Sequence, residues 1–260
     1  GTSTTGSLGS GTVTNNAALV LQRSNNFTIA NNIGGTGTLT KAGAGVATLT
    51  GDNTYTGVTT ITAGTLSIGA DAKLGTAPGS ATAGSLVLNG GTLLATYNFT
   101  LNSNRGISLT ASSTISVDTN DTLTYGGIVN DGASSLVLTK AGAGTLVLSG
   151  ANTYDGGTTI SGGILRAGIA STGAAGAVTN GPFGTGTVTV SSGFTLDMAG
   201  FNIANALNLS GAGIGNNGAL INSGDAATAS GAVTIGANAS IGGSGAITMN
   251  GAISASTFTV

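Results

Sequence analysis

Few side chains in this sequence have the type and spacing that chemistry requires. The closest pair of carboxylates is Asp118 and Asp121, and two carboxylates flanking a glycosidic bond can act as acid and base in polysaccharide cleavage. The pair has no aromatic-lined neighbourhood, and the basic residue that lyase chemistry needs is missing. We therefore expect both residues to lie in a solvated loop, and we predict no catalytic residue and no enzymatic activity.

Two lysines, Lys41 and Lys140, each begin a Lys-Ala-Gly-Ala-Gly run that resembles a phosphate-binding loop at first sight. The order Gly-Lys-Ser/Thr and a following helix, which such a loop requires, are both absent. The simpler interpretation is a lysine at a corner of the chain, where its charge keeps a sheet edge soluble. The sequence therefore predicts two exposed corner lysines and no phosphate site.

Metal and cofactor sites are not expected. The sequence contains no His and no Cys, which excludes imidazole and thiolate metal sites as well as Ser-His and Cys-His catalytic pairs. Calcium repeats of the Gly-Gly-x-Gly-x-Asp type are also missing, because residues 33–37 and 241–245 carry no Asp at the required place. We predict no metal ligand and no cofactor.

Aromatic and amide side chains recur at equivalent places. Tyr55 and Tyr154 could stack on sugars, but their equivalence favours corner rings that pack on the neighbouring coil of the chain. Asn53 and Asn152 are expected to form turns or a stacked amide ladder. Thr-x-Thr pairs raise ice binding as an alternative, yet they do not recur at one fixed period, which favours outward β-branched residues on a solvated sheet. These pairs are Thr38/Thr40, Thr48/Thr50, Thr60/Thr62 and Thr187/Thr189.

Most of these residues belong to one stretch of 31 residues that occurs twice, at residues 39–69 and 138–168. The two copies match at 19 of 31 positions, all of them Gly, Thr, Asn, Tyr, Lys, Ala or branched aliphatic residues. A repeat of this length is typical of stacked units that share one continuous core. We expect residues 1–260 to be a single continuous β-solenoid segment of a longer chain.

The composition favours short strands. The chain has 48 Gly but only 2 Pro, 40% apolar and 5% charged residues, and no Glu, so it suits neither collagen, disorder nor helices. Runs of strand length alternate with Gly and Asn turns that are too short for crossover helices. The sequence predicts a right-handed parallel β-helix of about 10 to 13 coils, with roughly 20 to 25 residues in each. Ile61 and Ile160 should point into its core.

Charge and hydropathy limit the partners. The net charge is −2 and the 6 cations are scattered singly, so no nucleic-acid surface is expected. Mean hydropathy is +0.36, but no apolar run approaches the roughly 18 residues of a membrane helix. The sequence shows no signal peptide and starts at Gly1, which suggests a processed form or an excised piece. The absence of Cys would suit a protein that is exported unfolded.

Two segments depart from the regular pattern. Residues 169–182 form the loosest stretch and are expected to be a loop that leaves the wall of the solenoid. Residues 256–260 read as a strand with no polar cap, and an uncapped edge invites pairing. We expect either that the natural chain continues past both ends or that copies stack end to end.

Each copy of the repeat contains the pattern Leu-x-Gly-x-Asn-Thr-Tyr-x-Gly-x-Thr-x-Ile-x-x-Gly-x-Leu. It is formed by Leu49, Gly51, Asn53, Thr54, Tyr55, Gly57, Thr59, Ile61, Gly64 and Leu66, and again by Leu148, Gly150, Asn152, Thr153, Tyr154, Gly156, Thr158, Ile160, Gly163 and Leu165. The pattern resembles the passenger-associated transport repeat of Gram-negative autotransporters, which form parallel β-helices.

The resemblance implies a non-enzymatic passenger segment, secreted or displayed on the cell surface, that acts as an adhesin or a structural stalk. Its partners would be host-cell or abiotic surfaces, or other copies of itself, with possible end-to-end assembly. Membrane contact would come only through a C-terminal β-barrel that is absent from this sequence. Two alternatives are a self-assembling surface filament of end-to-end solenoids and a polysaccharide-active β-helix enzyme.

Overall fold

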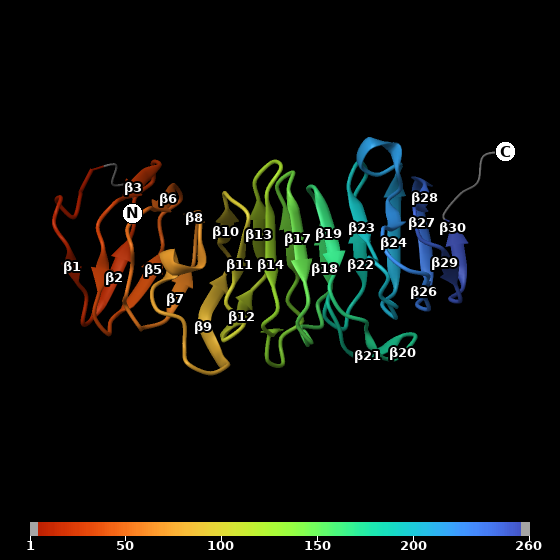
Figure 1. The fold of residues 1–260 in the computed structure, drawn as a ribbon, viewed down its shortest axis with the longest axis horizontal. Coiled ribbons are helices and arrows are strands. Elements are labelled where there is room, and N and C mark those ends of the chain that lie inside the picture. Colours follow the sequence, from red (N-terminus) through yellow and green to blue (C-terminus); the bar gives the residue numbers. More distant parts are fainter. Residues whose placement is uncertain (1–4, 256–260) are drawn as a thin grey trace.

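The backbone of residues 5–255, described by a computed structural model, winds into about 11 stacked coils (Figure 1). Strands of successive coils pair in parallel along the length of the rod. Among the described residues, the only sheet with antiparallel pairing is the hairpin of β20 (Thr172–Ala174) and β21 (Ala177–Asn180). The predicted all-β parallel solenoid is confirmed.

Three sheets form most of the wall. The long sheet has 11 strands: β3 (Phe27–Ile29), β6 (Val46–Leu49), β8 (Thr65–Ile68), β10 (Thr92–Ala95), β13 (Ser113–Val117), β16 (Leu138–Ala141), β18 (Thr158–Ile160), β22 (Val188–Val190), β24 (Leu207–Gly211), β27 (Val233–Ala239) and β30 (Ile253–Ala255). The seven-stranded sheet contains β11 (Phe99–Leu101), β14 (Thr122–Tyr125), β17 (Thr145–Leu148), β19 (Ile164–Ala167), β23 (Thr195–Asp197), β25 (Leu220–Asn222) and β28 (Ile241–Gly243).

The six-stranded sheet contains β2 (Ala18–Leu21), β5 (Thr38–Lys41), β7 (Thr59–Ile61), β9 (Thr82–Asn89), β12 (Arg105–Ala111) and β15 (Val129–Asn130). Two further pairs are β1 (Val13–Thr14) with β4 (Ile33–Gly34), and β26 (Ala227–Ala229) with β29 (Ile247–Met249). Two short 3₁₀ turns interrupt the strands, η1 (Asp71–Leu74) and η2 (Ile214–Asn216). Coils of unequal length therefore keep their strands in register by placing extra residues at the corners.

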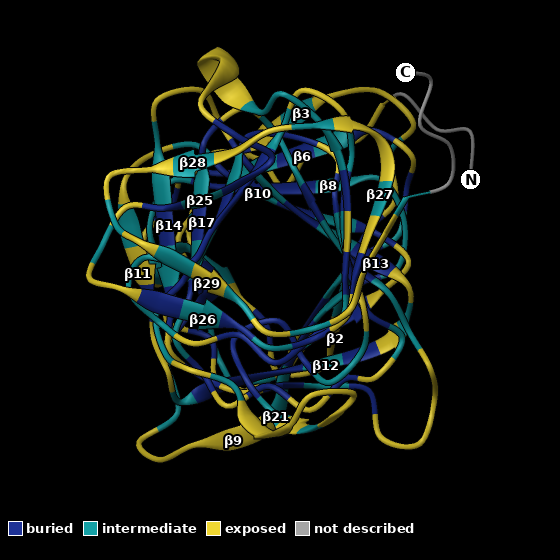
Figure 2. Ribbon diagram, turned by 90° about the vertical axis from the view of Figure 1, so that its right-hand side faces the viewer, coloured by how far each residue is buried: buried dark blue, intermediate teal, exposed yellow. Residues whose placement is uncertain are grey.

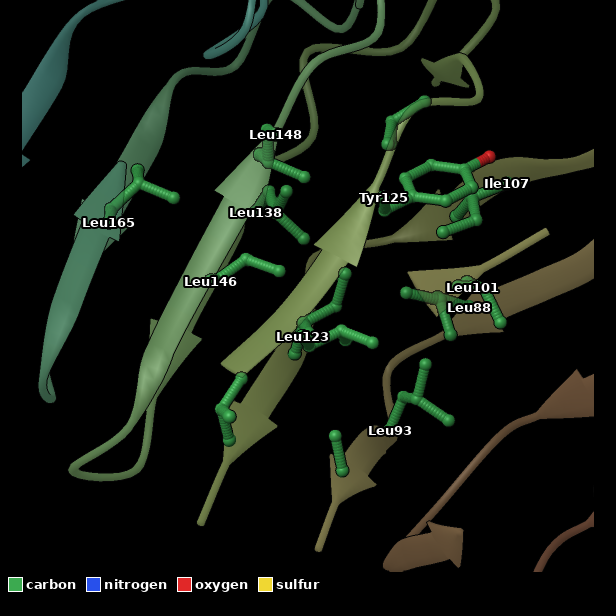
Figure 3. Packing of buried hydrophobic residues seen from close by; sticks show 14 of the residues in the cluster. Leu88, Leu93, Leu101, Ile107, Leu123, Tyr125, Leu138, Leu146, Leu148 and Leu165 are labelled. Atoms are coloured by element: carbon green, nitrogen blue, oxygen red, sulfur yellow. The ribbon is translucent and has the colours of Figure 1, made fainter. Parts of the chain in front are cut away.

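The core is a column of aliphatic side chains inside the coils. Residues alternate between the two faces of each strand, because a β-strand has a period of two. In β18, for example, Thr158 and Ile160 are buried whereas Thr159 is half-buried on the outside. Viewed along the axis, the inner wall is mostly buried and the outer loops are exposed (Figure 2). Figure 3 shows the interior packing of side chains from neighbouring strands, among them Leu93, Leu123 and Leu146.

Ile61 and Ile160 are both fully buried, which confirms their inward assignment. Residues 169–182 leave the wall as predicted, but they contain the hairpin β20–β21 rather than a plain loop, and its strands are mostly exposed (Figure 1). The expected uncapped strand at residues 256–260 lies outside the described residues.

The two copies of the repeat occupy different sides of the solenoid. In the first copy, β5 belongs to the six-stranded sheet and β6 to the long sheet. In the second copy, the equivalent strands β16 and β17 belong to the long sheet and the seven-stranded sheet. The second copy is therefore displaced by one sheet around the axis. It follows that the repeat specifies a corner and its two flanking strands, not a fixed position on the cross-section.

Candidate functional site

Both repeat lysines lie in the core, which contradicts the prediction of exposed corner lysines. Lys41 pairs with Leu21 on one side and Ile61 on the other, and its side chain is fully buried. Lys140 is also fully buried, between Ile115 and Ile160 of the long sheet. Each lysine thus replaces an aliphatic residue in an inward column.

The lysine ammonium groups bind backbone carbonyls of the following corner. Lys140 Nζ donates to the oxygens of Ala141 at 2.8 Å, of Gly142 at 2.9 Å and, from the next coil, of Gly162 at 2.9 Å. Lys41 Nζ donates to the oxygen of Gly43 and, at 3.1 Å, to that of Ala63. The three ammonium donors of Lys140 match three acceptors, and those of Lys41 reach two, so each cation joins two successive coils.

Burial without a carboxylate partner shifts the titration of these amines. Desolvation disfavours the charged form and lowers the pKa of Lys140 to about 8, and it lowers the pKa of Lys41 in the same direction. Neither lysine forms an ion pair among the described residues. Phosphate is therefore not the partner of these lysines, because their ammonium groups are already enclosed by carbonyl oxygens.

Each repeat tyrosine is enclosed by the neighbouring coil. The rings of Tyr55 and Tyr154 are fully buried, and each hydroxyl shares a hydrogen bond with a buried threonine, Thr59 at 2.8 Å and Thr158 at 2.7 Å. Burial raises the pKa of Tyr55 to about 12 and raises that of Tyr154 as well. The predicted packing against the next coil is confirmed, and stacking of these rings on a sugar is excluded by their burial.

A glycine in the next coil leaves space for each tyrosine ring. A Cβ on Gly75 would lie 3.1 Å from the ring of Tyr55, and a Cβ on Gly184 would lie 2.8 Å from the ring of Tyr154. Both glycines also have positive φ, +76° and +69°. The coil that follows each tyrosine therefore needs Gly at this position, for the backbone conformation and for the ring.

The repeat asparagines link three successive coils. The amide N–H of Ile33 donates to Asn53 Oδ1 at 2.9 Å, and Asn53 Nδ2 donates to the oxygen of Lys73 at 2.8 Å. Asn152 does the same between the Val129 N–H and the Pro182 oxygen, both at 2.7 Å. The side chains therefore bridge backbone groups, and do not stack amide on amide as one of the two predictions had it.

Two ion pairs, each with one buried partner, were not found by sequence reasoning. Arg105 binds the carboxylate of Asp71 at 2.8 Å and the carbonyls of Leu74 and Gly75, which holds η1 against the wall. Arg166 Nε lies 2.8 Å from the fully buried carboxylate of Asp197. In each pair the two residues are more than 30 positions apart, so no local pattern in the sequence connects them. The only signal in the sequence was that charged residues are scarce.

The acidic pair occupies a turn between β13 and β14. The N–H of Asp121 donates to the oxygen of Asp118 at 3.1 Å, and Asn120 between them has φ +66°. Asp118 is exposed and Asp121 is half-buried. The predicted solvated loop is confirmed as a tight turn. The described residues contain no group of three or more His, Cys, Asp or Glu that could hold a metal ion.

The outer face of the long sheet carries a row of polar side chains, all of them hydroxyls except the amide of Asn208. The only charged residue in its strands, Lys140, points inward. The quoted Thr-x-Thr pairs lie on two different sheets, but unequal corners bring a single row into register on the long sheet. This row is Thr65, Thr92, Thr114, Thr139, Thr159, Thr189, Asn208, Thr234 and Ser254.

The row members are half-buried or exposed. The eight threonines of the quoted Thr-x-Thr pairs are half-buried or exposed as well, so their predicted outward orientation is confirmed. Parallel strands place successive members about 4.8 Å apart. The threonines do not recur at a fixed spacing in the sequence, but the row on this face is nevertheless regular in space. No described helix, over residues 5–255, has the length and apolar character to cross a membrane.

Comparison with known proteins agrees with this architecture. The model of the passenger-associated-transport-repeat family matches residues 39–68 and 138–167. The protein named "Adhesin BmaC autotransporter" from Brucella suis biovar 1 (strain 1330) is 42% identical over 149 residues, which are 57% of this chain and 4% of that protein. The chain thus spans a small part of the length of this relative. No solved structure matches the chain.

Both matched ranges include the residues that form the buried connections between coils: the lysine, asparagine and tyrosine of each copy. Both matches begin in the first strand of the repeat and end with its fourth strand, β8 or β19. The chain therefore carries two passenger-associated-transport repeats within a parallel β-solenoid and is similar to an autotransporter passenger domain.

Proposed function

We propose that this chain is an extracellular segment of an autotransporter passenger, secreted or displayed on the surface of a Gram-negative bacterium, where it acts as a non-enzymatic adhesin or structural stalk. The observation that carries the proposal is the 42% identity over 149 residues to a protein named as an adhesin autotransporter. The solenoid supports it, because stacked coils produce a long wall from a repetitive sequence.

The outer wall is suited to contact rather than to catalysis. The residues singled out for chemistry are enclosed in the core or lie in an exposed turn. The long sheet presents hydroxyl groups over many coils without an outward charge on its strands. Such a surface can form many weak hydrogen bonds at once, and multivalent contact raises the overall strength of attachment.

The test uses the natural parent protein. Bacteria that produce it would be compared with bacteria whose gene lacks the region encoding residues 1–260, for binding to host cells, to abiotic surfaces and to each other. We expect weaker binding to at least one of these in the deletion strain. Equal binding in all three assays, with equal amounts of passenger on the surface, would refute an adhesin role for this segment.

The matched control is a parent protein that carries Thr159→Ser, a mild change on the outer face of β18 that keeps a hydroxyl group. It should bind like the wild type. The stalk role predicts a different result from the adhesin role: deletion of the segment shortens the displayed protein, and binding returns when a foreign solenoid of equal length replaces residues 1–260.

A further inference from the structure

One buried hydroxyl is left unpaired near the start of β9. Ser85 Oγ is the only buried side-chain nitrogen or oxygen within residues 5–255 that has no hydrogen-bond partner. Buried polar groups in native proteins are nearly always paired, and an unpaired one requires an explanation such as a bound water or ligand. The position of this oxygen is therefore informative.

Ser85 lines a groove of about 420 Å³ on the outside of the six-stranded sheet. The groove lies between the segment that leads into β9 and the chain just before β7, where this part of the wall bulges outward (Figures 1 and 2). Its volume falls in the range of small-molecule sites, roughly 300 to 1,000 Å³. The lining consists of Thr56, Val58, Thr76, Ala77, Pro78, Gly79, Thr82, Ala83, Gly84 and Ser85.

The outer wall of the groove is held in place by hydrogen bonds from two directions. Asn104 Nδ2 donates to the oxygen of Pro78 at 2.9 Å, and Arg105 donates to the oxygen of Gly75 at 2.5 Å. On the other side, Thr76 Oγ1 donates to the oxygen of Thr54 at 3.2 Å. Binding would therefore require little ordering of the protein, and this favours even a small contact area.

The lining chemistry selects a neutral ligand with both polar and apolar faces. No charged residue lines the groove, so neither a phosphate nor a carboxylate would find a counter-charge. The lining combines hydroxyl groups with the apolar surfaces of Val58 and Pro78. The hydroxyls of Thr76 and Thr82 already donate to backbone oxygens and can only accept from a ligand, whereas Ser85 Oγ has no partner. A lipid chain would leave the Ser85 hydroxyl unpaired, whereas a sugar offers C–H surface together with hydroxyls that can donate or accept.

An extended peptide is a poorer fit to the same groove. Peptides commonly bind a sheet by adding a strand to its free edge. Strand β9 pairs with β12 on one side and with β7 only over Leu86–Leu88 on the other, and Gly84, with φ +69°, interrupts the extended backbone before that pairing. Residues 82–85 therefore offer no regular strand edge to a peptide. Recognition would then depend mainly on side chains, which suits a ligand without a peptide backbone, such as a carbohydrate.

We propose that this groove binds a neutral saccharide of roughly one or two rings, with Val58 and Pro78 as the apolar walls and with Ser85 Oγ as a hydrogen-bonding partner that a rotation of its side chain turns toward the ligand. The inference deepens the proposed adhesin function by naming a class of ligand, and it rests on that function only for its biological role. Binding itself can be measured on the purified chain.

The experiment is ligand-observed and amide-detected NMR on the full chain with glucose, galactose, mannose, N-acetylglucosamine and their disaccharides, and with glucose 6-phosphate and N-acetylneuraminic acid as charged comparators. We expect at least one neutral sugar to bind with a dissociation constant of roughly 1 mM and to shift the amides of Val58 and Ser85. Val58→Arg, which fills the groove, should weaken binding at least tenfold. Thr40→Arg, on the outer face of the same sheet, should leave binding unchanged.

The Ser85→Ala variant distinguishes two roles of the Ser85 hydroxyl: binding a ligand, or only binding a water molecule. If the oxygen is unpaired without ligand, its removal should raise the melting temperature slightly and weaken sugar binding. Absence of binding by every neutral sugar, or unchanged binding in both Val58→Arg and Ser85→Ala, would overturn the proposal. A parent protein with Val58→Arg that still adheres as the wild type does would remove the groove from adhesion and leave the adhesin function standing.

Discussion

The buried lysines predict an unusual dependence of stability on pH. In the folded chain the pKa of Lys140 is lowered by desolvation from its ordinary value of 10.5 to about 8. Below pH 8 both states carry the proton, and the folded state bears the cost of the buried charge. Between about pH 8 and 10.5 the folded state loses the proton while the unfolded chain keeps it. The unfolded chain then binds more protons, so the free energy of unfolding rises with pH.

The size of the effect follows from the two pKa values. A difference of one pKa unit corresponds to about 1.4 kcal/mol, and the linkage relation gives a gain of about 1 kcal/mol between pH 7 and pH 9 for Lys140. Lys41 contributes with the same sign, because its pKa is lowered by the same cause. The buried tyrosines act in the opposite direction at higher pH: the pKa of Tyr55 is raised to about 12, so its stabilisation is lost above about pH 10.

The assay is urea unfolding at pH 7, 8 and 9, followed by circular dichroism, for the wild type and two variants. Lys140→Met removes the titrating amine and should reduce the rise in stability with pH. Ile115→Val, in the same inward column, should lower stability by about 1 kcal/mol while keeping the wild-type dependence on pH. A wild type whose stability is flat or falls from pH 7 to 9, or a Lys140→Met variant with the same slope, would refute the reasoning.

Three further predictions test the buried connections between coils. Ile160→Asp places an unpaired charge in the core and should lower the free energy of unfolding by more than about 4 kcal/mol, so unchanged thermal unfolding would contradict the inward position. Gly163→Ala should prevent normal folding, because φ is +58° and the new Cβ would lie 2.1 Å from the oxygen of Gly144; retention of a wild-type melting temperature would count against this close approach. Asn152→Ala should cost about 2 kcal/mol by leaving the Val129 N–H and one carbonyl unpaired, and urea unfolding measures the loss.

The parallel solenoid was predictable because strand-length apolar runs, Gly corners and a long internal repeat all favour the same architecture. The prediction that the two lysines are exposed at corners was wrong. Their inward orientation could nevertheless have been inferred from the alternation of side chains along the strand. Leu39 and Lys41 are two residues apart in one strand and therefore share a face, and Leu39 is buried. The general rule that lysine stays exposed outweighed this alternation. The rule failed because the Gly and Ala corners leave two carbonyl oxygens within reach of the Lys41 ammonium and three within reach of that of Lys140.

Other features depend on distances that the sequence does not contain. The ion pair of Arg105 with Asp71 joins residues 34 positions apart, and the lengths of the coils between them vary. The row of hydroxyls on the long sheet has no constant spacing in sequence for the same reason. The groove beside Ser85 arises where the chain between η1 and β9 bulges from the wall, and nothing in its composition indicates which side it covers.

The polar side chains of the repeat form hydrogen bonds to the coils before and after their own. In a partly folded chain, a coil whose neighbours have not yet formed lacks these partners. Asn53 needs the coil before it and the coil after it, and Tyr55 needs a glycine of the next coil beneath its ring. A single copy in isolation would leave these buried groups without partners, at a cost comparable to the stability that one coil contributes. A new coil is therefore favoured only where a completed coil already lies beside it. This dependence makes growth along the axis sequential, which is the property that a chain needs if it is to fold progressively as it leaves the cell.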